Sequence, residues 1–386
     1  MDPQAITRTL ASTKVAHVLH VIDRNIAAVA ADAIAINQIP APTFAERERA
    51  RFLIERFQTI GLTVERTPRW DVVAELGGSR KGPCLLLQAS LDTIFPPTVN
   101  PTARVEGKKV VGPGIGDNAL GLAALLALAE VFSRAGLEPL GRVVFAATTA
   151  TEGAGNVAGL KRVLKRLEGR VGWLLCLKGH DLGRLSYTTV CTRRLRIVWG
   201  GTNHRKAVEP MEFLPDLLRA LGALEGLGPG VKVDLDPIEG ILSSGSHATD
   251  GIGLDLKGGN ARSFAAAERA VRGVVREVAA ERGVALKTQA VGGWEETALP
   301  DQHPLVETVL AVHQALNIRT HPSPGGAEAA LALAAGIPTV VLGITHGRNR
   351  HRENEWVELE PISEGLAQVF LTALALTSTP GGRARP

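Results

Sequence analysis

The stretch PCLLLQASLDT at residues 83–93 decides the fold of this chain. Its first six residues are almost all apolar, which is typical of a strand that is buried on both faces of a sheet. The remainder, from Ala89 to Thr93, reads as a polar turn. Because ligands in open α/β sheets bind where buried strands end, the sequence predicts an α/β fold with a functional site at this turn.

Strands that end in polar residues and lead into helices recur along the chain. Apolar runs predict buried strands at 142–147, 173–177 and 338–343, and helical periodicity predicts helices at 119–132, 305–316, 329–335 and 362–376. The glycine-rich loop GPGIGDN at 112–118 leads into the first of these helices. It places Asp117 near a helix N-terminus, where the helix dipole favours a carboxylate, so helix capping is the alternative role of this residue.

The N-terminal part predicts two helices joined by a turn. Pro40 and Pro42 break the first helix within residues 26–61. Thr43, with Glu46 three residues later, predicts a capping box at the start of the second helix. Apolar residues then recur at helical spacing, which supports this second helix.

The pattern changes between residues 188 and 296. Alternating strands at 195–200, 251–257 and 284–291 are interleaved with helices at 211–224 and 263–282. This β-α-β-α-β order predicts a small ferredoxin-like α+β domain with one sheet and two helices. We expect it to be inserted into a larger α/β domain that consists of residues 1–187 and 297–386.

Composition excludes several classes of protein. The 386 residues include 43 Lys+Arg and 39 Asp+Glu, and only 4% are aromatic, which argues against a nucleic-acid-binding surface. The one basic cluster, Arg348-Asn349-Arg350-His351-Arg352, is either a solvated loop or a patch that steers anionic ligands into a cleft. The three cysteines lack a CxxC spacing, which predicts neither a disulfide framework nor a cysteine-zinc site. No apolar run approaches the roughly 18 residues of a membrane span and no leader pattern begins the chain, so we expect a cytoplasmic protein without membrane contact.

Separate segments of the chain hold the residues that could carry chemistry. There are five: Ser90-Leu91-Asp92-Thr93, Gly116-Asp117-Asn118, Thr151-Glu152-Gly153, Leu177-Lys178-Gly179 and His351-Arg352-Glu353-Asn354-Glu355. Their order, together with the inserted domain, resembles the dinuclear-zinc exopeptidase and deacylase family, which includes glutamate carboxypeptidase, acetylornithine deacetylase, succinyl-diaminopimelate desuccinylase and aminotripeptidase. The resemblance extends over nearly the whole chain. It implies a mixed-sheet catalytic domain, an inserted lid domain that also forms a homodimer, and an anionic small-molecule or short-peptide ligand.

The resemblance implies that one of two metal sites is lost. In the family this site uses a histidine, a bridging aspartate and a later acidic residue, which correspond here to Ser90, Asp117 and Lys178. Serine is a poor zinc ligand, and an ammonium has no free lone pair. Lys178 could take the place of the missing ion, because an ammonium about 4 Å from Asp117 contributes about 4 kcal/mol at a dielectric constant near 20. The alternative is a lysine that extends to solvent. Asp92 would orient the site from behind.

The other metal site keeps its full set of matching residues. Asp117, Glu152 and His351 correspond to the bridging aspartate, the glutamate and the histidine that hold the second ion in the family. With an open fourth position, such a set suits zinc or manganese. The resemblance therefore implies a degenerate site with one divalent ion, zinc in the first place, and the alternative is a site without metal.

The residues that act on the substrate are also altered. Thr151 stands where the family has its catalytic glutamate, and a hydroxyl cannot act as a base near neutral pH. Loss of a general base slows a typical enzyme roughly 10²- to 10⁴-fold. The resemblance implies that His204 contacts the developing oxyanion, that Lys257 replaces the arginine that grips a substrate carboxylate, and that Glu328 and Asn118 line the substrate pocket.

Three functions are compatible with these residues. The first is a metal-dependent hydrolase of peptide or other C–N amide bonds, with proton transfer by His180 or His346. The second is a catalytically inactive protein that binds a small anionic ligand in the same cleft. The third is a reaction without metal in which a desolvated Lys178 acts as base or nucleophile. The resemblance favours the hydrolase, and the altered base favours the binding protein.

Overall fold

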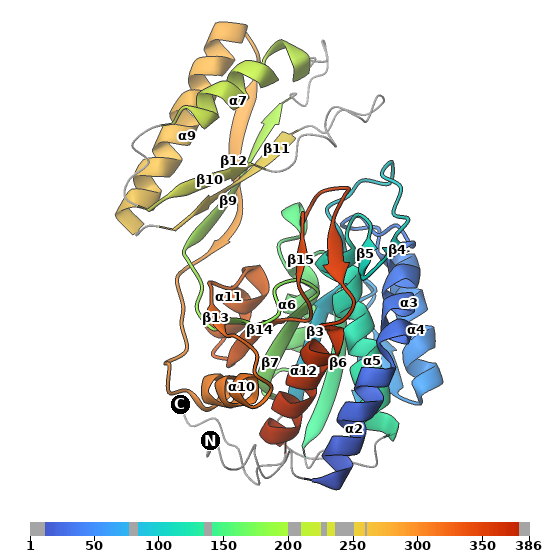
Figure 1. Ribbon diagram of the computed structural model, residues 1–386. Coiled ribbons are helices and arrows are strands. Elements are labelled where there is room, and N and C mark those ends of the chain that lie inside the picture. Colours follow the sequence, from blue (N-terminus) through green and yellow to red (C-terminus); the bar gives the residue numbers. More distant parts are fainter. Residues whose placement is uncertain are drawn as a thin grey trace. The chain divides into compact units, whose positions relative to one another are not determined.

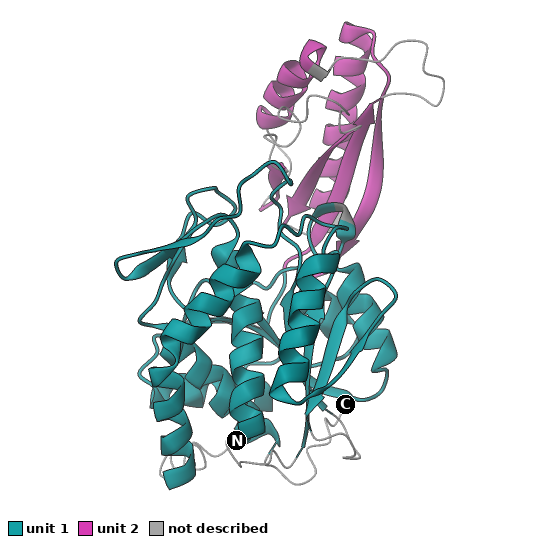
Figure 2. Cartoon of the chain, turned by 90° about the vertical axis from the view of Figure 1, so that its right-hand side faces the viewer, with its two compact units in different colours: residues 1–189, 297–386 teal, residues 190–296 magenta. Residues whose placement is uncertain are grey.

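The chain forms two compact units, which are coloured separately in Figure 2. The computed structural model describes residues 12–76, 84–134, 141–199, 210–224, 230–235, 251–258 and 261–377. Unit 1 consists of Met1–Thr189 and Thr297–Pro386, and unit 2 consists of Val190–Glu296. The predicted limits of the inserted segment are residues 188 and 296.

A mixed sheet forms the centre of unit 1 (Figure 1). Its strands are β1 (Thr63–Arg66), β2 (Val72–Leu76), β3 (Cys84–Ser90), β6 (Arg142–Thr148), β7 (Val171–Lys178), β8 (Arg184–Ser186), β13 (His321–Pro322) and β14 (Thr339–Gly343). They lie in the order β1-β2-β6-β3-β7-β14-β8-β13. The central strands β6, β3, β7 and β14 are parallel to one another, whereas β1, β2 and β8 pair antiparallel with their neighbours β2, β6 and β14. The predicted α/β class with a mixed sheet is confirmed.

Both faces of β3 are buried, as its apolar sequence predicts. Leu85 and Leu87 join one hydrophobic core, and Cys84 and Leu86 join another core on the opposite face. The first core is built with helices α2 (Thr13–Arg24), α3 (Ile26–Asn37), α4 (Arg47–Ile60), α5 (Leu120–Arg134), α10 (Pro304–Ala315) and α12 (Ile362–Thr377), and the second with α6 (Ala158–Arg166) and α11 (Ala327–Ala334). Helices on both faces leave the strand ends as the place where polar side chains can gather.

The helical stretch Ile115–Arg134 corrects one expectation from the sequence. It has 20 residues and a mean hydropathy of 1.6, so it is long and apolar enough to cross a membrane by length and composition. However, 83% of its apolar window is buried inside the protein. Burial of this kind is what the core helix of a sheet protein shows, because its apolar side chains pack against the strands.

A second, small sheet in unit 1 attaches the C-terminal loop to the glycine-rich loop. It contains β4 (Arg104–Glu106), β5 (Lys109–Val111), β15 (Gly347–Arg348) and β16 (Trp356–Glu358) in the order β15-β16-β5-β4. Beyond the β16–β5 pairing, Gly112 N donates a hydrogen bond of 2.8 Å to Glu355 O. This sheet therefore holds residues 349–355 beside residues 112–118, although the two segments are far apart in the sequence.

The predicted capping box at Thr43 and Glu46 is wrong. Helix α4 begins at Arg47, and its N-cap residue Glu46 makes no side-chain capping bond. The Thr43 hydroxyl instead donates to Asp92 Oδ2 at 3.0 Å, and Glu46 Oε1 accepts hydrogen bonds from Phe44 N and Ala150 N. Both side chains connect loops near the ends of β3 and β6. These contacts are with residues distant in the sequence, so the local sequence pattern does not reveal them.

Unit 2 has its own sheet and its own core. Its strands β9 (Thr192–Trp199), β10 (Lys232–Leu235), β11 (Gly251–Lys257) and β12 (Leu286–Trp294) form an antiparallel sheet in the order β10-β11-β9-β12. Helices α7 (Leu214–Gly222) and α9 (Ala261–Arg282) bury Leu217 and Val271 against Leu195 and Ile197. Strand β10 was not predicted, because its four residues are too short and too polar for a periodic signal.

Candidate functional site

The candidate site lies where β3 and β7 end in unit 1. These strands are hydrogen-bonded neighbours, so the residues that follow β3 and the last residue of β7 meet at one edge of the sheet. Lys178 ends β7, Asp92 follows β3, and Asp117 lies in η1 (Ile115–Ala119) at the start of α5. All three side chains are buried. The structure thus gathers three of the predicted residues at the strand ends.

The Asp117 carboxylate is surrounded by donors. Lys178 Nζ lies 3.2 Å from its Oδ1, and His351 Nε2 lies 2.9 Å from its Oδ2. Arg350 donates to Oδ2 from Nε at 2.7 Å and contacts the same oxygen with Nη2 at 2.6 Å. Burial by itself raises the pKa of Asp117, but the charges of Arg350 and Lys178 together hold this pKa well below its usual range. Asp117 is therefore an ionised carboxylate.

Lys178 is enclosed between two carboxylates. Its Nζ lies 2.9 Å from Glu328 Oε1 in addition to its contact with Asp117. Burial alone lowers the pKa of Lys178, but the negative charges of Asp117 and Glu328 outweigh it and raise this pKa above its usual value. The geometry is the one that the ion-replacement hypothesis for Lys178 requires. The reaction in which Lys178 acts as base or nucleophile is disfavoured, because it needs an unprotonated amine.

Arg350 is a site residue that the sequence analysis missed. It was assigned only to the basic run of residues 348–352, yet its guanidinium binds Asp117 Oδ2 directly. The signal that could have revealed it is its position immediately before His351, on a loop that must approach Asp117 if His351 does. Asp117 therefore faces two permanent cations, one from a strand end and one from this loop.

The residues present do not fit a divalent ion in the arrangement that the structure has. Within the residues that the structure describes, there is no group of three His, Cys, Asp or Glu side chains placed to hold one ion. Both oxygens of Asp117 are engaged by cationic side chains, so a metal would have to displace Arg350 or Lys178. The predicted set of Asp117, Glu152 and His351 is thus only partly assembled, because Asp117 and His351 are in contact and Arg350 is bound to the same oxygen.

Asp92 positions the loop that carries Thr151 and Glu152. Its carboxylate accepts hydrogen bonds from Thr151 N at 3.0 and 2.9 Å, from Glu152 N at 2.8 Å and from the Thr43 hydroxyl. Burial raises the pKa of Asp92, although these hydrogen bonds oppose the shift. Asp92 therefore acts on the backbone of the loop, in agreement with a positioning role.

Thr151 and Glu152 both have side chains without a bonded partner among the described residues. The buried Thr151 hydroxyl has no hydrogen-bond partner among the described residues. The partly buried Glu152 carboxyl has neither a hydrogen bond nor an ion pair within the same set, and its pKa is raised to about 7, first by burial and then by the charge of Asp117. Two polar side chains that lack partners at one loop leave hydrogen-bonding capacity for a ligand.

The Asn118 side chain contacts the ends of two strands next to the site. Its Nδ2 donates to Leu177 O at 2.9 Å and approaches Ser90 Oγ at 3.4 Å, and the side chain is completely buried. Its Oδ1 has no partner within the described parts of the chain. The structure therefore uses the amide of Asn118 to connect β3 with β7, and its Oδ1 faces Gly121 of α5.

Glu355 and His180 form a buried pair that fixes the Asp117 loop. The Glu355 carboxylate accepts hydrogen bonds from Gly114 N, Gly116 N and Asp117 N at 2.9 to 3.0 Å. His180 Nε2 lies 2.7 Å from the same carboxylate. His180 thus has a buried carboxylate partner, His346 is exposed, and the proton-transfer role of either residue stays a prediction. The role of Glu355 was missed because nothing local distinguishes it from other acidic loop residues.

Two further predicted site residues, His204 and Lys257, belong to the inserted segment. His204 is outside the described residues. Lys257 belongs to unit 2, where its Nζ lies 2.9 Å from Asp234 and 3.7 Å from Asp255. Its charge is therefore partly balanced within its own unit.

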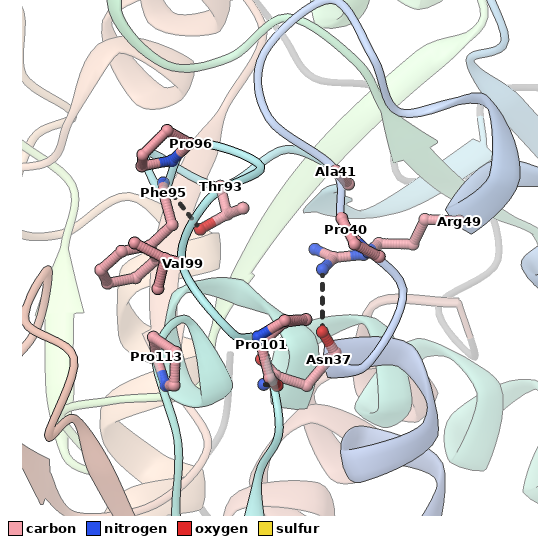
Figure 3. Close-up of a pocket in the computed structure, with 10 residues that line it drawn as sticks. All are labelled: Asn37, Pro40, Ala41, Arg49, Thr93, Phe95, Pro96, Val99, Pro101 and Pro113. Atoms are coloured by element: carbon pink, nitrogen blue, oxygen red, sulfur yellow. Dashed lines mark hydrogen bonds between the residues drawn. The ribbon is translucent and has the colours of Figure 1, made fainter. Parts of the chain in front are cut away.

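A small pocket beside Thr93 is shown in Figure 3. Its wall is rich in proline, and its volume of about 10 Å³ has room for roughly one water molecule. Arg49 reaches it from α4 and donates to the carbonyl oxygens of Ile39, Leu91 and Asn37. This pocket is too small for a substrate, and the buried Arg49 serves to connect three segments of backbone.

Comparison with known proteins supports these assignments at the level of fold and family. Residues 86–375 match the family described as Peptidase family M20/M25/M40. Among solved structures, a tripeptidase from Staphylococcus aureus is 18% identical, with a TM-score of 0.67, 92% of this chain covered and 99% of the other. Human carnosine dipeptidase 1 is 13% identical, with a TM-score of 0.73 and coverage of 95% and 100%. A dinuclear metal binding peptidase from Bacillus subtilis is 16% identical, with a TM-score of 0.58 and coverage of 92% and 99%. The search of curated proteins found no match.

Proposed function

The chain belongs to peptidase family M20/M25/M40, and from this premise we propose that it binds a short peptide or an N-acyl amino acid without hydrolysing it by a metal-assisted route. Similar structures include a tripeptidase and a dipeptidase, which supports a peptide-like ligand. The proposal is carried by one observation. The Asp117 carboxylate, which would bridge two ions in a dinuclear site, is instead neutralised by Lys178 and Arg350.

The proton-transfer residues support the same proposal. Metal-assisted hydrolysis needs a group that takes a proton from the attacking water, and the Thr151 hydroxyl cannot do this near neutral pH. A hydroxyl is nevertheless a good donor and acceptor for a bound amide. The unpartnered Thr151 Oγ1 would therefore serve recognition in the absence of turnover.

The charges of the loop that carries Arg350 favour an anionic ligand. Asp117 and Glu328 balance Lys178 and Arg350, so these four residues contribute little net charge. The same loop carries exposed Arg348 and Arg352 beside exposed Glu353, which leaves an excess of positive charge at the surface. We further propose that unit 2 mediates a homodimer, for which the support is the resemblance to the exopeptidase family.

An amide hydrolase is the second candidate, and Glu152 is the observation that favours it. A carboxyl whose pKa is raised to about 7 is suited to general acid–base catalysis near neutral pH. In this alternative Glu152 would take the part of the missing base, and Thr151 would only contact the substrate.

Binding and turnover can be measured on the same purified protein. We expect calorimetric titration with a panel of N-acetyl amino acids, dipeptides and tripeptides to show saturable binding of at least one member. We expect mass spectrometry to find no amide cleavage of that ligand, with or without added zinc or manganese. EDTA should leave its affinity unchanged. Cleavage above background that is lost in Glu152→Gln would contradict the proposal and establish the hydrolase.

A further inference from the structure

Three arginines surround one tryptophan ring in unit 1. The guanidinium carbons of Arg66, Arg47 and Arg51 lie 4.3, 5.0 and 5.4 Å from the centroid of the Trp70 ring. Arg47 and Arg51 are one turn apart on α4, and Arg66 ends β1. We call these four residues the arginine–tryptophan cluster. Any two of its guanidinium carbons are at most about 10 Å apart, because the two longest distances to the centroid together span 10.4 Å.

The Trp70 ring is fixed by the turn that joins β1 to β2. Thr67 N donates to Asp71 O at 2.9 Å, and Trp70 N donates to Thr67 O at 3.0 Å. Trp70 has a φ of 71°, in the left-handed region where a bulky residue is rare and where a functional reason is worth seeking. Its ring also packs against the first hydrophobic core. The arginines therefore contact a rigid ring, which lowers the entropy that a ligand must remove when it orders them.

The arginines of the cluster are exposed and are only partly balanced by carboxylates. The side chains of Arg47 and Arg51 are 57% and 45% exposed. Among the residues that the structure describes, their one carboxylate partner is Glu48, which lies 3.1 Å from Arg51 and 3.9 Å from Arg47. Arg66 is also exposed and has no ion pair within the same residues.

Two other carboxylates of this region are already paired with arginines outside the cluster. Glu65 of β1 pairs with Arg166, and Asp71 accepts a hydrogen bond from Arg162 Nε at 2.7 Å. Three guanidinium charges against the single carboxylate of Glu48 leave an excess of two positive charges around one ring.

We propose that the arginine–tryptophan cluster binds a ligand that carries two or more linked phosphate groups. Such a ligand brings at least two negative charges within a few ångströms, which matches the excess charge of the cluster. Phosphate oxygens also accept the forked pairs of N–H groups that a guanidinium presents. Contact with an aromatic ring leaves these in-plane donors available. A single carboxylate fits less well, because Glu48 already supplies one and leaves the excess in place.

The first test is a calorimetric titration of the full-length protein with tripolyphosphate in low-salt buffer. We expect saturable binding at one site per chain, and weaker binding when salt is added, because exposed charges are screened. The chain has five tryptophans, so isotope-labelled tryptophan gives five indole N–H resonances. The resonance of Trp70, assigned with Trp70→Phe, should shift during the titration more than the other four.

Matched variants separate this site from a general effect of charge. One exposed ion pair changes an equilibrium by up to about fivefold, so Arg66→Gln should weaken tripolyphosphate binding about two- to fivefold. Adding Arg47→Gln should bring the loss to about tenfold or more. Arg134→Gln removes the same charge from α5, where the side chain is 72% exposed, and should bind as wild type does. A thermal melt checks that each variant is folded.

A linked phosphate group can come from a free polyphosphate or from a nucleotide. ATP carries the same triphosphate as the first probe and adds a nucleoside. Equal affinity for ATP and tripolyphosphate would identify the phosphates alone as the recognised group. Tighter binding of ATP, with the same loss in Arg66→Gln, would identify a nucleotide as the source.

Three results would overturn the inference. The first is the absence of saturation by tripolyphosphate up to about 10 mM, beyond the range of weak specific binding. The second is equal weakening by Arg66→Gln and Arg134→Gln. The third is tighter binding of a tetraglutamate peptide than of tripolyphosphate, which would assign the cluster to an acidic protein segment. None of these measurements depends on the ligand of the proposed function, so the two proposals fail independently.

Discussion

At Asp117, burial and charge act on the same carboxylate in opposite directions. Burial favours the protonated form, and the adjacent cations favour the ionised form strongly enough to win. The balance depends on each partner remaining in place. Because Lys178 is shared with Glu328, its loss would leave two buried carboxylates facing each other without a counter-charge.

Lys178→Met should strongly destabilise the protein. Removing one member of a buried ion pair typically costs about 3–5 kcal/mol, because the remaining charges stay buried. The free energy of unfolding in urea at pH 7 measures this effect. Lys108→Met is the matched control, since the Lys108–Glu360 pair is fully solvent-facing and should contribute at most about 1 kcal/mol. Equal effects of the two substitutions would contradict this account of Lys178.

Glu152 should make stability depend on pH in a definite direction. Its pKa is about 7 in the folded protein, above the value of about 4.3 expected in the unfolded chain. Between these values the unfolded chain releases the proton and the folded protein keeps it, so stability falls as pH rises through the window. Compared with wild type, Glu152→Gln should gain roughly 1–3 kcal/mol between pH 5 and pH 8. Unfolding measured at both pH values tests this, and a difference that does not change with pH would count against the raised pKa.

At the scale of elements, the site depends on how two loops are attached to each other. The pairing of β16 with β5 brings residues 349–355 beside residues 112–118, and the Glu355 carboxylate then accepts three backbone hydrogen bonds from the glycine-rich loop. His180, beyond the end of β7, contacts the same carboxylate. A single buried side chain thus connects three elements that converge on Asp117.

Glu355→Ala should disrupt this connection. It leaves three backbone N–H groups and His180 without their acceptor, and each unsatisfied buried group costs about 1–3 kcal/mol, so a loss of at least about 3 kcal/mol is expected. Urea denaturation gives the loss of stability, and ligand titration should show weaker binding. Glu355→Gln keeps the size and one acceptor oxygen, so it should lie between alanine and wild type. A loss below about 1 kcal/mol for alanine would refute the role of Glu355.

At the scale of the whole molecule, the chain leaves unit 1 and returns to it at neighbouring positions. Thr189 N donates to Thr297 O at 2.7 Å, and Thr188 and Ala298 form an isolated bridge. Unit 2 also has a separate hydrophobic core around Leu195, Ile197 and Phe213. Adjacent ends and separate cores are the conditions under which one unit can be removed without unfolding the other.

Replacement of residues 190–296 by a short Gly-Ser linker should therefore leave unit 1 folded. We expect circular dichroism to show a cooperative thermal transition for the shortened protein, because its sheet and both of its cores are intact. The separate fragment 190–296 should also unfold cooperatively. If the shortened protein shows no cooperative transition, the two units are not independent in stability.

The fold could be predicted from local patterns because each buried segment carries a regular pattern of apolar residues. The strands around 84–90 and 171–178 were recognised from continuous apolar runs, and the helix that follows Asp117 from its apolar periodicity. Strand β10 was not recognised because its four residues are too short and too polar for a periodic signal. The interactions of Thr43 and Glu46 were not recognised because they depend on partners distant in the sequence.

The sequence by itself determined the α/β class, the family, the position of Asp117 near a helix N-terminus and the position of Lys178 at a strand end. Only the tertiary structure decided which charges neutralise Asp117, since Arg350 is 233 residues away in the chain and reaches it through the pairing of β16 with β5. The physical reason is that the free energy of apolar burial is proportional to the buried area, and each segment carries its own apolar pattern. An ion pair acts over only a few ångströms, so it exists only when the folded chain brings both charges together.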